Sequence, residues 1–104
     1  MLIVTKETLQ QIQSSSKPVI IDAYASWCGP CMYMKPIFEE LSKELGDKYL
    51  FAELNVDDAR EIAIQYGISS VPTFVFIKDG QIKNKETGAM SKEDFIDKIQ
   101  EIFG

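Results

Sequence analysis

Two kinds of hydrophobic pattern alternate along the chain. Short, almost continuously apolar runs at 19–25, 49–56 and 73–77 predict strands that are covered on both faces. Between and after these runs, apolar residues recur at three- and four-residue spacing. This spacing predicts a long helix over 31–45 and a last helix over 91–103. Alternation of strands with helices is typical of a sheet that is largely parallel.

The remaining predicted elements are shorter. Residues 2–4 suit an edge strand, and Thr5 is a candidate N-cap for a short helix that carries Leu9 and Ile12. Asp57 or Asp58 is expected to cap a third helix. Asp58 and Glu61 have the spacing of a capping box there, and Gly67 ends that helix as Gly46 ends the long one.

Turn residues complete the C-terminal half of the chain. Asp79-Gly80 predicts a tight hairpin between 73–77 and a partner strand at 81–85, and Ser91 is expected to cap the last helix. The predicted order is β-α-β-α-β-α-β-β-α. We therefore predict an α/β fold with a central mixed β-sheet flanked by helices on both faces. No repeat or linker divides residues 1–104, so we expect one domain.

Composition narrows the classes of function. The chain has 104 residues, of which 45% are hydrophobic, and a net charge of −5 from 16 acidic and 11 basic residues. No basic cluster suits nucleic acid, and no apolar run approaches the length of a membrane span. Residues 1–7 lack the long apolar region of a signal peptide. If the sequence is complete, we expect a cytoplasmic protein, an inference that a removed signal would undo.

The candidate chemistry lies in Cys28-Gly29-Pro30-Cys31, which contains both cysteines of the chain. The pair falls between a predicted strand and a predicted helix, so both thiols lie near a helix N-terminus. Unpaired N–H groups and the helix dipole favour the thiolate there, and the thiolate is the reactive form. Pro30 suits the first turn of a helix, and we expect Gly29 to allow a tight turn.

The cysteines have two alternative interpretations. A structural zinc site normally needs four Cys or His ligands, and this chain has two Cys and no His. Two buried, inert cysteines are the simplest alternative, but this spacing between a strand and a helix is unusual by chance. A redox-active dithiol is the favoured interpretation.

The burial or exposure of four residues near the cysteines can be predicted. Asp22 interrupts the apolar strand 19–25. It either reaches solvent at the end of the strand or lies buried beneath the cysteines with a raised pKa. On the helix that follows, Met34 falls on the apolar face, whereas Met32 and Tyr33 are the better candidates for exposure.

Several motifs together carry a family resemblance that covers almost the whole chain. They are Trp27-Cys28-Gly29-Pro30-Cys31 after a buried strand, Asp22, Pro36, Val71-Pro72-Thr73, Lys78-Asp79-Gly80 and Gly88-Ala89. The chain resembles the thioredoxin family in these positions. The resemblance implies the thioredoxin fold and a protein-disulfide reductase of cell redox homeostasis. It also implies electrons from NADPH through a flavin-dependent thioredoxin reductase, with no bound cofactor or metal, and we expect a monomer.

Residue roles follow partly from position and partly from the resemblance. Cys28 comes first and lies nearer solvent, so we expect it to attack a substrate disulfide and Cys31 to resolve the mixed disulfide. The resemblance implies that Asp22 assists Cys31 as a general base. It also implies that Val71-Pro72 is cis although most X–Pro bonds are trans, and that Val71 pairs with the substrate peptide. Trp27, Gly29, Pro30, Pro72, Gly88 and Ala89 would form the docking surface.

The chain departs from the family pattern in ways that make the site more acidic. Glu53 stands where the family commonly has a lysine, Met32 stands where a basic residue is frequent, and Tyr24 replaces a different aromatic residue. Glu53 either points beneath the cysteines and titrates as a pair with Asp22, or points into solvent. We expect these differences to bear on substrate preference and redox potential and to leave the dithiol chemistry intact.

Three functions remain open at this point. The first is a disulfide reductase, the second a dithiol oxidase or isomerase, and the third a thioredoxin-fold subunit that binds partners without turnover. Gly29-Pro30 between the cysteines resembles the reducing members of the family. An apolar surface around Trp27 would serve an enzyme and a binding subunit equally well.

Overall fold

The computed structural model describes all of residues 1–104 and contains the predicted order of strands and helices. The elements are β1 (Leu2–Ile3), α1 (Leu9–Gln13), β2 (Val19–Tyr24), α2 (Gly29–Leu45), β3 (Leu50–Asn55), α3 (Arg60–Gln65), β4 (Thr73–Lys78), β5 (Gln81–Thr87) and α4 (Lys92–Phe103).

The five strands form one mixed sheet in the order β1-β3-β2-β4-β5. β1 and β2 both run parallel to β3, while β4 is antiparallel to β2 and to β5. The short strand β1 lies at one edge, as predicted, and the almost fully buried strand β2 lies at the centre. The predicted α/β fold with a mixed sheet is confirmed.

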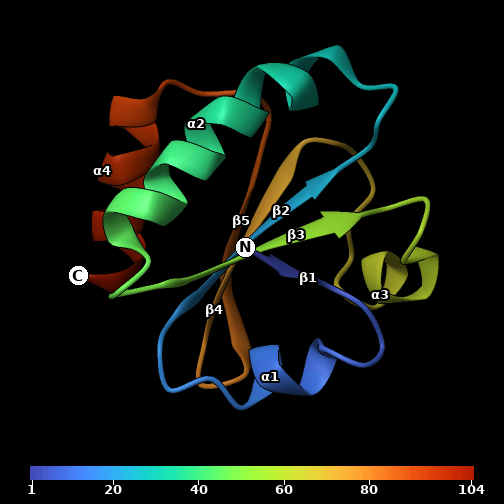
Figure 1. Cartoon of the computed structure of the whole chain (residues 1–104), viewed down its shortest axis with the longest axis horizontal. Coiled ribbons are helices and arrows are strands. Elements are labelled where there is room, and N and C mark those ends of the chain that lie inside the picture. The colour runs from blue at the N-terminus through green and yellow to red at the C-terminus, as the bar shows by residue number, and fades with distance from the viewer.

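Side chains alternate between the two faces of the sheet along each strand, and both faces carry apolar side chains. Helices therefore cover both faces. Val19 and Ile21 of β2 face α1 and α3, in a cluster with Ile12 and Ile62. Ile20 faces the opposite way, into a cluster built on α2 and α4. Figure 1 shows α2 and α4 together on one side of the sheet and α1 and α3 away from them. Asp22, two residues after Ile20, therefore lies on the α2 side of the sheet.

Two of the predicted local signals are confirmed in the C-terminal half. Asp79 and Gly80 both have positive φ, at 54° and 76°, so the β4–β5 hairpin turns as the Asp-Gly sequence predicts. Ser91 is the N-cap of α4, and its side chain accepts a hydrogen bond from the Asp94 N–H at 3.1 Å. The turn and the cap fix where β5 and α4 begin.

The predicted capping of α3 is wrong. Its N-cap is Ala59, which makes no side-chain capping bond. Asn55 instead accepts hydrogen bonds from the N–H groups of Asp57 and Asp58, at 3.0 and 3.3 Å. An asparagine at the end of a strand satisfies these donors in a turn before the helix starts. Glu61 lies in the first turn of α3 but pairs with Lys6, at 3.6 Å.

The start of α1 and the ends of α2 and α3 can also be compared with the predictions. α1 begins at Leu9 after a turn in which Thr5 Oγ1 accepts from the Thr8 N–H, at 3.2 Å. Gly67 ends α3 with the expected positive φ of 69°. Gly46 instead keeps a right-handed φ of −66°. A Cβ there would lie 2.5 Å from the Ser42 carbonyl oxygen, so close approach and not left-handed backbone favours glycine.

Candidate active site

The two cysteines occupy the start of α2, at the end of the loop that follows β2. Cys28 is the N-cap residue with an extended backbone, and Cys31 lies in the first turn. They form a disulfide whose Cα atoms are 5.2 Å apart. Cys28 Sγ accepts a hydrogen bond from the Cys31 N–H at 3.2 Å. An N–H group at a helix N-terminus therefore faces the Cys28 sulfur, where it stabilises negative charge.

The two sulfur-bearing residues differ in exposure. Cys28 is 6% exposed and Cys31 is 1% exposed. Pro30 occupies the first turn of α2 as predicted, where its missing N–H is not needed. The tight turn predicted at Gly29 is wrong, because its φ is not positive and a Cβ there would meet no atom within 4 Å. Within the isolated chain, no backbone constraint accounts for this glycine.

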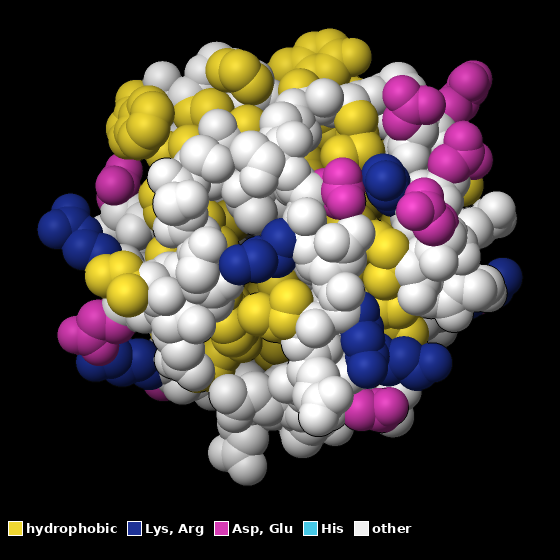
Figure 2. Space-filling view, turned by 180° about the vertical axis from the view of Figure 1, so that it is seen from behind, with side chains coloured by type: hydrophobic (Ala, Val, Ile, Leu, Met, Phe, Trp, Pro, Cys, Tyr) yellow, Lys and Arg dark blue, Asp and Glu magenta, His cyan; other side chains and the backbone are white.

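Large exposed apolar side chains flank the pair in the sequence. Trp27 is 72% exposed, and Met32 and Tyr33 are exposed as predicted, whereas Met34 is buried in the core. Figure 2 shows hydrophobic side chains along the upper edge of the molecule, over the end of the sheet at which α2 begins in Figure 1. Trp27 Nε1 donates a hydrogen bond to Asp57 Oδ2 at 3.0 Å, which holds the indole although it is exposed.

A second segment lies beside the cysteines. The Val71–Pro72 peptide bond is cis, as the resemblance implied. Val71 is half-buried against the cluster that contains Cys28 and Cys31. The Gly88 N–H donates to the Pro72 carbonyl oxygen at 2.9 Å, which brings the two predicted docking segments together. Gly88 has a φ of 101°, a conformation that favours glycine, and Ala89 after it is exposed.

Asp22 lies buried on the α2 side of the sheet, so the alternative of a solvent-exposed strand end is wrong. It is 3% exposed, and its Oδ1 has no hydrogen-bond partner. Burial is the largest cause that raises the pKa of Asp22 to about 7, and the charge of Glu53 raises it further, while Lys35 acts in the opposite direction. A carboxyl group with such a pKa can both hold and release a proton near neutral pH.

Glu53 is the direct neighbour of Asp22 on β3, since the two residues pair in register. Its side chain is 19% exposed and forms an ion pair with Lys35 Nζ at 3.7 Å. The alternative in which Glu53 points into solvent is therefore wrong. Sequence reasoning missed Lys35, although its position four residues after Cys31 puts it one helical turn further along the same side of α2.

Comparison with known proteins identifies the family. Residues 1–101 match the sequence profile named Thioredoxin. The chain belongs to the thioredoxin family. It is 44% identical to a thioredoxin of Chlorobaculum thiosulfatiphilum over 94 residues, which cover 90% of this chain and 87% of that protein.

Other members of the thioredoxin family come from distant sources. A thioredoxin of Mycoplasmoides gallisepticum is 41% identical, with 88% of this chain and 91% of that protein covered. The chloroplastic thioredoxin M-type of Spinacia oleracea is 42% identical, with 86% of this chain and 49% of that protein covered. With its Cys28–Cys31 pair, this family member is a thiol-disulfide oxidoreductase of the protein-disulfide reductase type.

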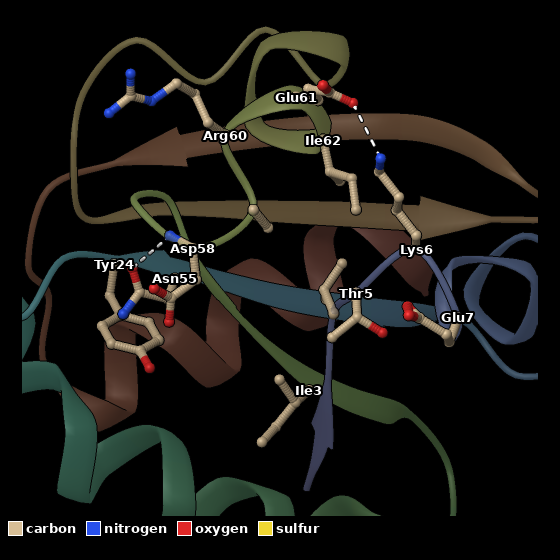
Figure 3. Close-up of a pocket in the computed structure, with 12 residues that line it drawn as sticks. Ile3, Thr5, Lys6, Glu7, Tyr24, Asn55, Asp58, Arg60, Glu61 and Ile62 are labelled. Atoms are coloured by element: carbon tan, nitrogen blue, oxygen red, sulfur yellow. Dashed lines mark hydrogen bonds and ion pairs between the residues drawn. The ribbon is translucent and has the colours of Figure 1, made fainter.

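A separate cavity of about 550 Å³ lies between the start of the chain and α3. Figure 3 shows the Lys6–Glu61 ion pair at this cavity, and neither cysteine lines it.

No cluster of His, Cys, Asp and Glu side chains is arranged to hold a metal ion. None of the helices is both long and apolar enough to cross a membrane.

Proposed function

We propose that the reduced chain transfers two electrons to disulfides of protein substrates in an ordered exchange. The Cys28 thiolate attacks one sulfur of the substrate disulfide, that bond breaks, and the other substrate sulfur leaves as a thiolate and takes a proton. Cys31 then attacks Cys28 Sγ, the mixed disulfide breaks, and the second substrate thiol leaves. The Cys28–Cys31 disulfide is the oxidised product. The capping position of Cys28 and the deeper burial of Cys31 support this order.

Asp22 is proposed as the base that accepts the Cys31 proton, through a bridging water. Cys31 is almost fully buried, so its proton needs an acceptor inside the protein. Asp22 lies on the sheet face that α2 covers, it has an oxygen without a protein partner, and its pKa is raised by burial to about 7. A base is most effective when its pKa is close to the working pH.

The substrate is proposed to dock as an extended peptide over the cysteines. Trp27, Gly29 and Pro30 would contact it from one side and Pro72, Gly88 and Ala89 from the other, with Val71 pairing through its backbone. The N–H and C=O groups of Val71 make no hydrogen bond within the chain, which leaves them free for a peptide partner. The apolar side chains around the pair suit a polypeptide better than a small charged disulfide.

Recycling is proposed to come from an NADPH-dependent flavoprotein reductase that reduces the Cys28–Cys31 disulfide. The chain itself would act as one monomeric domain over residues 1–104, with no bound cofactor. We place it in a reducing compartment, the cytoplasm, because a lone exchangeable cysteine pair serves catalysis there. Its similarity to bacterial thioredoxins supports this.

Reduction of insulin disulfides with dithiothreitol as electron donor tests the proposal. We expect turnover by the wild type, loss of turnover in Cys28→Ser, and wild-type turnover in Ser26→Ala, a change of an exposed residue in the same loop. Turnover by Cys28→Ser at the wild-type rate would contradict the catalytic role. A reduction potential as high as that of protein disulfide isomerase, about −180 mV, would indicate an oxidase or isomerase instead.

A further inference from the structure

Three charged side chains meet where β2, β3 and α2 pack together. Asp22 and Glu53 are register partners on adjacent parallel strands, so their side chains leave the sheet on the same face. Lys35 reaches this pair from α2, and its Nζ lies 3.7 Å from Glu53 Oε2. Lys35 thus pairs directly with Glu53, the register partner of Asp22.

The Lys35 ammonium group is held from two directions. Glu53 pairs with it on one side, and the ring of Tyr24 lies under it, with 5.2 Å between Nζ and the ring centroid. A cation over an aromatic face is attracted to the ring. The lysine therefore has a defined position between the sheet and the helix that carries Cys31, although part of its side chain is exposed.

Few other charges face Asp22. From β4 its register partner is the apolar Phe74. The next acid across the sheet is Glu86, which pairs with Phe74 in register and is engaged by Lys98 at 3.8 Å and by Asn84 at 2.8 Å. The charged groups that act on Asp22 are thus Glu53 on β3 and Lys35 on α2, and the titratable Tyr24 lies two residues further along the same strand.

We propose that Lys35 is a positioning residue for the second step of disulfide exchange. By pairing with Glu53, it fixes that side chain and offsets its negative charge, so that Asp22 can release and accept a proton although a second acid stands beside it. The inference rests on the proposed role of Asp22 as the base for Cys31. It assigns the balancing cation to the same helix that carries both cysteines.

The directions in which neighbouring groups shift the pKa of Asp22 agree with the geometry. Burial and Glu53 raise the pKa of Asp22, and Lys35 lowers it. Loss of Lys35 must therefore raise the pKa of Asp22 above about 7. A rise of roughly one unit would reduce the ionised fraction of Asp22 at pH 7 about five-fold. The rate at which Cys31 resolves the mixed disulfide should fall by the same factor.

The test uses Lys35→Gln, Glu53→Gln, the double variant and the conservative Lys35→Arg, with Lys43→Gln as a control for loss of a charge on the same helix. Carboxyl NMR titration follows Asp22, and stopped-flow mixing of the reduced protein with a disulfide substrate follows release of the mixed disulfide against pH. We expect Lys35→Gln to shift both profiles upward by roughly one unit. Glu53→Gln should shift them downward, and Lys35→Arg and Lys43→Gln should leave them near the wild type.

The double variant provides a further check. Glu53→Gln should lower the pKa of Asp22 more in the Lys35→Gln background than in the wild type, because Lys35 no longer offsets the charge. An Asp22 titration that does not move in Lys35→Gln, or that moves equally in Lys43→Gln, would overturn the role of Lys35. A shifted titration with an unshifted rate profile would instead overturn the role of Asp22 as base, and with it the link from Lys35 to the reaction.

Discussion

In the proposed mechanism, Asp22 serves catalysis at a cost to stability. Its strand is otherwise apolar, and nothing in the protein hydrogen-bonds its Oδ1. Burying an ionised carboxylate without such partners is costly, so the folded protein favours the protonated form. The same burial brings the pKa of Asp22 to about 7, where proton transfer to and from a thiol is effective.

We expect Asp22→Asn to stabilise the fold at high pH. The pKa of Asp22 is raised from 3.8 to about 7, so the folded state binds the proton more tightly than the unfolded state between these values. The free energy of unfolding therefore falls as pH rises through that window, and the penalty is complete above it. A neutral amide removes a penalty of up to about 4 kcal/mol at pH 8 and changes little below pH 4.

Urea denaturation of Asp22→Asn and wild type between pH 4 and 9 measures this difference. The exposed Asp97→Asn is the matched control and should give no gain that grows with pH. A stability difference between Asp22→Asn and wild type that is the same at pH 4 and pH 8 would contradict a buried, protonated Asp22.

At the residue scale, the sequence predicted what depends on neighbours along the chain. The cysteine pair is a local motif at a strand–helix junction, and the apolar run around Asp22 indicated its burial. Lys35 and Asp57 were missed as partners because their contacts join separate elements. Asp57 meets Trp27 across 30 positions of sequence, and no local pattern specifies that pairing. The direction of the Glu53 side chain likewise depended on the register between β2 and β3.

At the scale of elements, the turn between β3 and α3 can be tested directly. Asn55 Oδ1 accepts from two backbone N–H groups, whereas the Asp58 side chain makes no capping bond to α3. We expect Asn55→Ala to lower the free energy of unfolding by about 1 kcal/mol. Asp58→Ala should cost clearly less. Thermal or urea unfolding of both variants checks the difference, and a larger loss in Asp58→Ala would restore the capping box that the sequence predicted.

Element order was predictable and element ends were less so. Continuous apolar runs and helical spacing correctly indicated the nine elements in order, because each pattern reflects which faces are buried. Helix starts depend on which polar group reaches a few N–H donors, and Asn55 competes with Asp57 and Asp58 for that role. Ser91 was predicted correctly since no such competitor precedes it. Gly46 ends α2 as predicted, but the reason for glycine there is the close approach of the Ser42 carbonyl oxygen and not a left-handed backbone.

At the scale of the whole molecule, the exposed apolar side chains of Trp27, Met32 and Tyr33 flank the cysteines, and a cavity of about 550 Å³ lies elsewhere. Polypeptide substrates should therefore depend on the surface more than small disulfides do. We expect Trp27→Ala to raise the KM for insulin several-fold, on the order of 1 kcal/mol of lost contact. Its rate with a small aromatic disulfide should stay near wild type.

Steady-state kinetics with both substrates separate these effects. Ile64→Ala removes an equally exposed apolar side chain on α3 and is the matched control. A parallel loss with both substrates in Trp27→Ala would indicate that the indole supports the reactive cysteine itself, and an equal loss in Ile64→Ala would show that the effect is not specific to the proposed surface.

Trapping of the mixed disulfide tests most directly whether Cys28 attacks the substrate and Cys31 resolves the intermediate. Each single variant, Cys28→Ser and Cys31→Ser, is incubated with a disulfide-containing protein and resolved on non-reducing gels. Cys31→Ser retains the attacking thiol and lacks the resolving one, so we predict a disulfide-linked complex that dithiothreitol cleaves by reduction. Cys28→Ser should trap little, because its remaining thiol, Cys31, is the more deeply buried of the two. Equal trapping by the two variants, or more by Cys28→Ser, would contradict the ordered mechanism.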